Sequence, residues 1–264
     1  MRTAILLAAG RGRRLGSLTQ GRPKCLLRVG TRTLLEHQLS ALQGAGIERV
    51  VAVLGYAAPA VEEALGGRPV IRVQNPRHRE TNSLYSLWLA RDYAGEGFVL
   101  LNADVLFDPE ILGRLLASPH PDALAVERRP SFDPEDMKVE LEGERVRALS
   151  KTLPAERAQA ENLGVLKFSP AGSRALFACM EELLRQGAEG EMCPYAFDAL
   201  APRHPLYAVP VDGSPWIEID FVDDLLRARE QVWPKILHRR TELALPAPTL
   251  EPTARANPSS GLGD

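Results

Sequence analysis

Short apolar runs alternate with amphipathic segments through the first 118 residues of the chain. The runs have the length and composition of buried strands and lie at residues 3–9, 49–56, 69–75 and 97–104. The segments that follow them repeat apolar residues at helical spacing and lie at residues 32–46, 58–67, 81–93 and 108–118. Because a crossover between parallel strands is right-handed and carries its helix to one face, this order predicts a parallel sheet covered on both faces.

The pattern changes after about residue 120. Runs with the character of mixed or antiparallel strands follow one another at residues 123–130, 137–143, 145–151 and 162–169, before a helical pattern over residues 171–187. A tight turn is expected at Glu142-Gly143. The expected fold class is therefore α/β, a Rossmann-like three-layer sandwich with a mostly parallel mixed sheet and an antiparallel extension.

The chain is expected to form one domain over residues 1–240. Its 264 residues are 45% hydrophobic, which is enough for a sizeable core. From Thr241 onward, prolines and glycines break every periodicity, so residues 241–264 are predicted to form a disordered tail.

Composition excludes several classes of function. A net charge of −2 argues against a nucleic-acid-binding surface spread over the protein. The three cysteines are widely spaced and form no CxxC pair, so neither a disulfide framework nor a zinc site is indicated. The first apolar run is too short for a secretory signal, and no stretch approaches the roughly 20 apolar residues of a membrane span. We therefore expect a cytoplasmic protein without a membrane partner.

One local exception is the loop after the first strand. It carries five basic residues and no acid between the first and the last of them, namely Arg11, Arg13, Arg14, Arg22 and Lys24. Glycine backbone at a strand end can hold phosphate oxygens, because the missing side chain allows close approach. The P-loop pattern GxxxxGK[ST] is absent, and Gly10, Gly12 and Gly16 miss the dinucleotide spacing GxGxxG by one residue. The loop predicts a small anionic partner of another kind.

The pattern LAAG-x-G-x-R-L, followed ten residues after Arg14 by Pro23-Lys24, resembles the signature of nucleotidyltransferases that join a nucleoside triphosphate to a phosphorylated sugar or alcohol. The resemblance extends to about Trp233. It implies that Arg14 and Lys24 act in catalysis by neutralising a triphosphate that carries about four negative charges. The loop residues that would bind the nucleotide are Leu7, Ala8, Ala9, Gly10 and Gly12. For Arg11, Arg13 and Arg22, simple solvent exposure explains the charge equally well.

Three carboxylates are candidates for a metal site. Asp104 lies just past a fully apolar strand, where open α/β sheets place their ligands. Glu218 and Asp220, at i and i+2 in the segment SPWIEIDFVDD, are expected on one face of a strand directly before a helix. In the resembling family, an aspartate like Asp104 and the acids of a W-x-E-I-D segment bind the metal together, which implies Mg²⁺ here. The alternative is capping, by Asp104 at a strand end and by Asp220 at a helix start.

The segment TNSLYSL resembles a helix start in the phosphocholine cytidylyltransferase branch of this superfamily. Asn82 and Ser83 would bind a pyrimidine edge or the acceptor, and both also suit a helix N-cap. The Asp-Met-Lys-Val and Ser-Lys segments resemble the same branch. Lys151 is implied to contact the acceptor phosphate or the α-phosphate in catalysis, with exposure at a strand end as its alternative.

Three further residues are candidates for binding the acceptor. Asp136 can face an ammonium group, and Glu161 stands before an apolar strand as in the resembling branch. The indole of Trp216, beside the metal acids, can hold a quaternary ammonium at roughly 0.5–2 kcal/mol per aromatic contact. The antiparallel extension would thus form the acceptor side of the site.

The resemblance implies a magnesium-dependent transfer of a cytidylyl group from CTP to a small phosphorylated alcohol or phosphonate, such as phosphocholine. Two alternatives stay open. One is a sugar-1-phosphate or inositol-1-phosphate nucleotidyltransferase that uses another triphosphate. The other is a catalytically silent, nucleotide-binding regulatory subunit, against which the intact metal acids argue. Whether the chain forms a homodimer is also left open.

Overall fold

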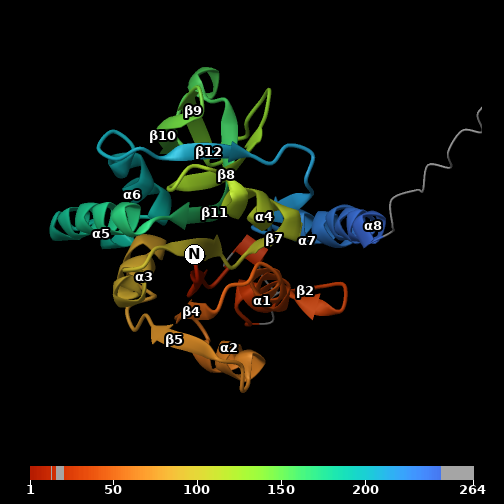
Figure 1. Ribbon diagram of the computed structural model, residues 1–264. Coiled ribbons are helices and arrows are strands. Elements are labelled where there is room, and N and C mark those ends of the chain that lie inside the picture. The colour runs from red at the N-terminus through yellow and green to blue at the C-terminus, as the bar shows by residue number, and fades with distance from the viewer. Residues whose placement is uncertain (13, 16–20, 245–264) are drawn as a thin grey trace, which may run out of the picture.

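A nine-stranded mixed sheet forms the centre of the computed structural model, which describes residues 1–12, 14–15 and 21–244 (Figure 1). In spatial order its strands are β5 (Val70–Gln74), β4 (Arg49–Leu54), β1 (Thr3–Ala8), β6 (Phe98–Asn102), β11 (Ala160–Phe168), β8 (Ala123–Arg128), β12 (Tyr207–Pro210), β10 (Arg145–Ser150) and β9 (Lys138–Glu142). The first four are mutually parallel, and β11 pairs antiparallel with β6 and β8. The parallel half and the antiparallel extension therefore meet at the junction of β6 and β11.

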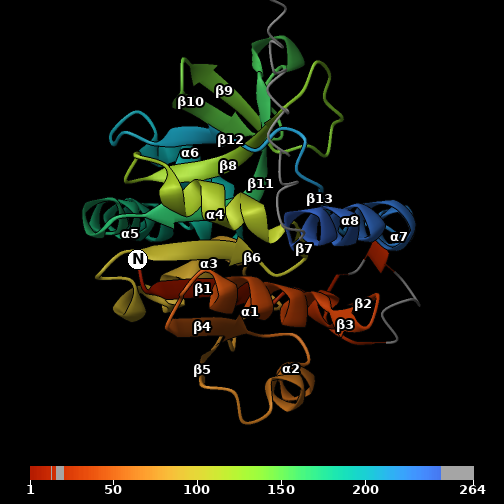
Figure 2. The same ribbon diagram turned by 45° about the vertical axis from the view of Figure 1, so that its right-hand side comes forward.

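Helices cover both faces of this sheet. On one face α1 (Leu34–Gly44), α2 (Ala58–Leu65) and α4 (Pro109–Ala117) bury leucine, isoleucine and valine side chains against the strands. On the other face lie α3 (Ser83–Leu89), α5 (Pro170–Arg185) and α6 (Cys193–Leu200). Figure 2 shows α1 and α4 in front of the sheet and α3 and α6 behind it. The three-layer α/β fold expected from the sequence is confirmed.

The helix starts follow from local chemistry. Thr33 and Glu36 form a reciprocal capping box at the start of α1. Asp108 caps α4, whose first residue is Pro109, and Ser169 caps α5. These caps satisfy backbone N–H groups that have no partner within the helix.

A third, smaller hydrophobic cluster lies beside the sheet. It joins the hairpin of β2 (Arg28–Val29) and β3 (Arg32–Thr33), the pair β7 (Val105–Phe107) and β13 (Trp216–Glu218), and the helices α7 (Val222–Arg227) and α8 (Trp233–Ala244). A π-helical turn at residues 228–232 links the two helices. The Trp233 indole packs on Gly30, where an added Cβ would lie 2.5 Å from Nε1. Through this cluster, α7 and α8 pack beside the loop that follows β1 and contains Gly10 and Gly12, called the glycine loop below.

Several elements were not expected from the sequence. Strand β7 has three residues, β12 enters the sheet between β8 and β10, and α6 was not predicted. The strand expected at Glu218 and Asp220 is present as β13, but it ends at Glu218, so Asp220 lies between it and α7. Helix α8 continues to Ala244, past the boundary expected at residue 240. Residues 245–264, which make up most of the predicted tail, lie outside the described part of the chain, as do Arg13 and Gly16.

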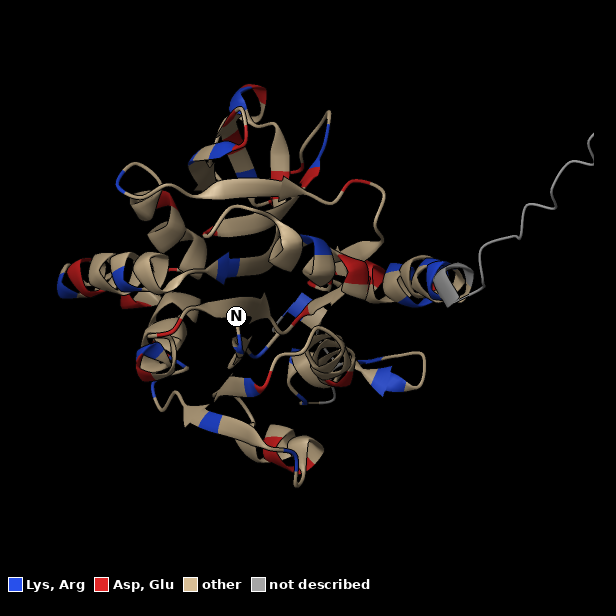
Figure 3. Cartoon of the chain, in the orientation of Figure 1, with Lys and Arg blue, Asp and Glu red and all other residues tan. Residues whose placement is uncertain are grey.

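Charged residues lie on helices, loops and several strands, whereas the central strands β1 and β6 carry none (Figure 3). Among the helices in the described ranges, none combines the length and hydropathy that a membrane span requires.

Candidate active site

A cavity of about 230 Å³ opens at the carboxyl ends of β1 and β6. Most of the residues predicted for nucleotide, metal and acceptor contacts line it: Leu7, Ala9, Gly10, Arg14, Lys24, Asn82, Ser83, Asp104, Lys151, Glu218 and Asp220. Ala8 is buried at the end of β1, and Gly12 packs against Lys24. Residues that are up to 213 positions apart in the sequence, from Leu7 to Asp220, thus surround one space.

The three predicted metal acids meet in this cavity. One carboxylate oxygen from each of Asp104, Glu218 and Asp220 lies within 4.8 Å of the others. The β7–β13 pair creates this meeting, because Glu218 lies opposite Val105 and the Ile219 N–H donates to the Asp104 carbonyl at 3.1 Å. The first strand of the pair directly follows Asp104, and the second ends at Glu218.

Two polar residues outside the predicted set hold these acids in place. Gln38 of α1 is buried and donates to the carbonyls of Asn102 and Val105, both at 2.8 Å, on either side of Asp104. Asp224 of α7 accepts from the backbone N–H groups of Asp220 and Phe221 at 3.0 and 2.8 Å. The sequence signal for Gln38 was a lone polar residue within the apolar stripe of a helix.

The carboxylates have the character of a divalent cation site. Burial, together with the nearby charges of Asp104 and Asp220, raises the pKa of Glu218 to about 8. Clustered carboxylates that repel one another are stabilised by a cation, and Mg²⁺ prefers such oxygen ligands together with water and substrate phosphates. The donor set therefore fits Mg²⁺.

Lys24 places a cation against the same carboxylates. Its Nζ lies 3.0 Å from Asp104 Oδ2 and also donates to Asp220. Burial opposes the charge, but the two carboxylates outweigh it and raise the pKa of Lys24. The aliphatic stem of Lys24 packs on Gly12, where φ is +67° and an added Cβ would lie 2.5 Å from Lys24 Cγ. The glycine loop thus positions Lys24 by leaving out a side chain.

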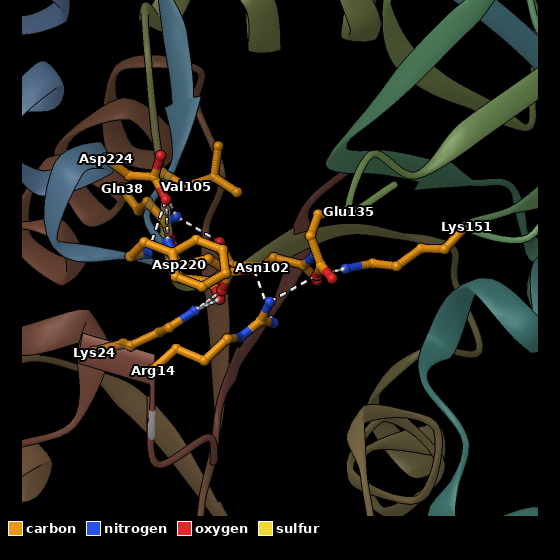
Figure 4. Close-up of polar contacts among 11 residues, drawn as sticks. Arg14, Lys24, Gln38, Asn102, Val105, Glu135, Lys151, Asp220 and Asp224 are labelled. Atoms are coloured by element: carbon orange, nitrogen blue, oxygen red, sulfur yellow. Dashed lines mark hydrogen bonds and ion pairs between the residues drawn. The ribbon is translucent and has the colours of Figure 1, made fainter. Parts of the chain in front are cut away.

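Arg14 and Lys151 approach the cavity from different elements (Figure 4). Arg14 contacts Asp220 Oδ2 at 2.9 Å and Glu135 Oε2 at 2.7 Å. Lys151, directly after β10, contacts the same oxygen of Glu135 at 3.0 Å. Burial opposes the charge of Arg14, and the carboxylates of Asp220 and Glu135 raise its pKa.

Asn82 and Ser83 lie at the start of α3, and Asn82 caps the helix by accepting from the Ser83 N–H at 2.8 Å. Behind them, the buried Asn75 amide donates to the hydroxyls of Thr81 and Ser86 at 3.1 and 3.0 Å. Sequence reasoning missed Asn75, although it follows a strand as Asp104 does. These hydrogen bonds fix the hydroxyl and amide groups that line this side of the cavity.

A second hollow of about 300 Å³ lies beside the first and contains the other predicted residues, Asp136, Glu161 and Trp216. Within the described chain the two hollows have only Glu218 and Asp220 in common. Arg129 was missed; its guanidinium contacts Glu161 Oε2 at 2.7 Å and lies 5.5 Å from the centre of the Trp216 ring. Among the described residues, seven acids and two arginines line this hollow, so it favours a cationic group.

Comparison with known families agrees with this geometry. The family model of the MobA-like NTP transferase domain matches residues 4–257. The chain belongs to this family. The resemblance to nucleotidyltransferases inferred from the sequence is confirmed.

Two curated relatives of this MobA-like family member match most of its length. A CMP-5'-(3-aminopropyl)phosphonate synthase of Streptomyces rubellomurinus is 35% identical over 239 residues, which cover 85% of this chain and 38% of the relative. A bifunctional IPC transferase and DIPP synthase of Rubrobacter xylanophilus is 34% identical over 243 residues, which cover 87% of this chain and 51% of the relative. The chain therefore spans about half or less of the length of these relatives.

Among solved structures, the inositol-1-phosphate CTP transferase from T. maritima superposes with a TM-score of 0.72. It is 25% identical, and the match covers 88% of this chain and 98% of that one. The fold is thus shared over nearly the whole of the solved protein.

Proposed function

We propose that the protein is a cytidylyltransferase that joins the CMP part of CTP to a small phosphorylated or phosphonylated acceptor and releases pyrophosphate. An acceptor oxygen forms a bond to the α-phosphorus of CTP while the bond from that phosphorus to the pyrophosphate oxygen breaks. The single observation that carries the proposal is the meeting of Asp104, Glu218 and Asp220 with Lys24 and Arg14 at the strand ends. The activities named for the relatives support CTP as the nucleotide.

Arg14 and Lys24 would bind the triphosphate and stabilise the charge that develops on the departing pyrophosphate. Lys24 would exchange its carboxylate partners for phosphate oxygens without a large movement, since it already lies in the cavity wall. Asp104, Glu218 and Asp220 would hold Mg²⁺, which would neutralise phosphate charge and polarise the phosphorus that is attacked. An acceptor phosphate with a second pKa of about 6 is already a dianion at neutral pH, so no side chain has to remove a proton.

Lys151 would orient the acceptor phosphate or phosphonate near the metal acids. The acidic hollow around Asp136 and Glu161 would take a cationic end of the acceptor, with Trp216 beside it. An aminoalkyl phosphonate or phosphocholine-like acceptor fits this division into an anionic and a cationic end. The named substrate of the Streptomyces relative, an aminopropyl phosphonate, has the same two ends.

An inositol-1-phosphate acceptor is the second candidate, because the inositol-1-phosphate CTP transferase from T. maritima shares this fold over 98% of its own chain. A neutral polyol does not use the negative charge of the second hollow, so we rank it below the amino acceptors.

The test is pyrophosphate release by the purified protein with Mg²⁺, from each of the common nucleoside triphosphates. The acceptors compared would be 3-aminopropylphosphonate, phosphocholine, inositol-1-phosphate and glucose-1-phosphate. We expect release with CTP and an amino acceptor, and Asp220→Asn should lower it by at least about a hundredfold. Release only with a sugar phosphate, or only from another triphosphate, would overturn the assignment.

A further inference from the structure

One carboxylate oxygen joins the two cations that approach the cavity from different elements. Glu135 Oε2 accepts from Arg14 Nη1 at 2.7 Å and from Lys151 Nζ at 3.0 Å. Arg14 belongs to the glycine loop, and Lys151 follows β10 in the antiparallel extension. Figure 4 shows both side chains extended toward Glu135.

Hydrogen bonds among neighbouring residues stabilise the turn that carries Glu135. The Asp133 N–H donates to Asp136 Oδ2 at 2.8 Å, and the Asp136 N–H returns a bond to the Asp133 carbonyl at 3.1 Å. The buried Lys138 donates to the carbonyls of Asp133 and Asp136, at 3.3 and 3.4 Å. The backbone of Glu135 is therefore fixed by a hydrogen-bonded turn, while its side chain is 57% exposed.

The arrangement resembles the contact that a substrate phosphate would make. Two cations converge on a single anionic oxygen, as they would on a phosphate oxygen. Glu135 is not one of the three carboxylates that meet as a metal set, so its charge is not required there. In the proposed reaction the same two cations contact phosphate groups, and Glu135 and a phosphate cannot both occupy them fully.

We propose that Glu135 is a positioning residue that holds Arg14 and Lys151 over the cavity and is displaced from them by substrate phosphate. The inference rests on the proposed roles of Arg14 and Lys151. Without Glu135 the two like charges would lose a shared partner near the cavity mouth. With it they stay in place, and each arriving phosphate exchanges with a carboxylate that is already there.

Displacement predicts a gain of anion affinity when the competing charge is removed. Calorimetric titration of the full-length protein with inorganic pyrophosphate, in the presence of Mg²⁺, measures this without any turnover. We expect Glu135→Gln to bind pyrophosphate about two- to tenfold more tightly than the unchanged protein, since two partly exposed ion pairs no longer compete. In a Lys151→Gln background the same change should have a smaller effect, because one of the two pairs is already gone.

Glu140→Gln is the matched control. Glu140 pairs with Arg157 on the same antiparallel extension and contacts neither cation of the cavity. The Glu140→Gln variant should bind pyrophosphate with the same affinity as the unchanged protein, within the error of the measurement. Unchanged or weaker binding by Glu135→Gln would overturn the proposal, and so would an equal gain in Glu140→Gln, which would indicate a general charge effect. Because no cytidylyl transfer is measured, this result is separate from the test of the proposed function.

Discussion

At the scale of single residues, Gly12 shows how a missing side chain positions a cation. Two requirements coincide there, a φ of +67° and the close approach of the Lys24 stem. Gly143, in the turn between β9 and β10, has the first requirement alone, with a φ of +62° and no described atom within 4 Å of an added Cβ. A comparison of substitutions at Gly12 and Gly143 therefore distinguishes the effect of backbone strain from the effect of the contact with Lys24.

Gly12→Ala should lower both stability and turnover, whereas Gly143→Ala should lower stability alone. Each substitution places a side chain in left-handed backbone, which costs about 1 kcal/mol. Only the first displaces Lys24, and we expect at least a tenfold loss of pyrophosphate release from it. Urea denaturation and the release assay on both variants check this, and equal activity in the two would contradict the role of the contact.

Glu161 makes stability depend on pH. Burial, opposed by Arg129 and reinforced by the charges of Asp136, Glu127 and Asp133, raises the pKa of Glu161 from 4.5 to about 7. The folded protein therefore binds a proton that the unfolded chain has released between these values, and stability falls as the pH rises through this window.

Glu161→Gln removes this dependence. Relative to the unchanged protein, the free energy of unfolding of the variant should rise between about pH 4.5 and pH 7, by up to about 3 kcal/mol. Urea denaturation of both proteins across this range measures the difference. A difference that stays constant with pH would show that Glu161 ionises normally in the folded protein.

Single residues were also where sequence reasoning was most and least successful. The candidates Arg14, Lys24 and Asp104 stood in motifs whose residue types carry their chemistry, and they line one cavity. Gln38 and Asn75 had weak local signals, a polar residue within an apolar helix stripe and a polar residue after a strand, and both were missed, as was Arg129. Their roles depend on tertiary contacts that no local pattern contains.

At the scale of elements, the metal acids depend on a pairing of two three-residue strands. β7 and β13 have three residues each, and more than 100 residues separate them, so their pairing could not be predicted from periodicity. Helices α1 to α5 and the strands β1, β4, β5 and β6 were predicted because each has a complete local pattern. A strand at Glu218 was also predicted, but β7, β12, α6 and α8 were not.

A buried carboxylate joins several elements at the opposite side of the fold. Asp122, directly before β8, accepts from the Ser169 N–H at 2.6 Å and contacts His204 Nε2 at 2.7 Å. It thereby ties β8 to the start of α5 and to the loop before β12. An added Cβ at Gly172 would lie 2.0 Å from Asp122 Oδ1, so the carboxylate can approach the start of α5 only because residue 172 has no side chain.

Asp122→Asn should lower the free energy of unfolding by about 1–3 kcal/mol, because an amide cannot accept all of these hydrogen bonds and its own N–H groups lack partners. Glu182→Gln, which breaks the exposed pair with Arg203, should change it by less than about 0.5 kcal/mol. Urea denaturation measures both variants. A loss no larger than that of the control would show that the tie contributes little.

At the scale of the whole molecule, ligand and metal binding should stabilise the fold, because the site joins segments from both ends of the described chain. Mg²⁺ together with CTP should raise Tm, and a chelator should reverse the rise while leaving the protein folded. A ligand present at 100 times its dissociation constant adds about 2.7 kcal/mol. Thermal unfolding followed by circular dichroism, with and without the chelator, is the measurement.

Asp104→Asn should lose most of this metal-dependent rise, since it removes one of the three carboxylates. Asp223→Asn, an exposed change on α7 outside that set, should retain it. A full rise in Asp104→Asn would place the metal elsewhere in the protein.

The wall that the two hollows share has an evolutionary consequence. Within the described chain, that wall consists of Glu218 and Asp220, and Glu135 and Asp224 of the second hollow also contact residues of the first. Positions that line only the second hollow and make no such contact, such as Asp136 or Trp216, can change with less effect on the first. In the proposed reaction, such substitutions would alter which acceptor is activated while the residues proposed to bind the nucleotide stay the same. The arrangement would let one scaffold diversify over several acceptors through few mutations.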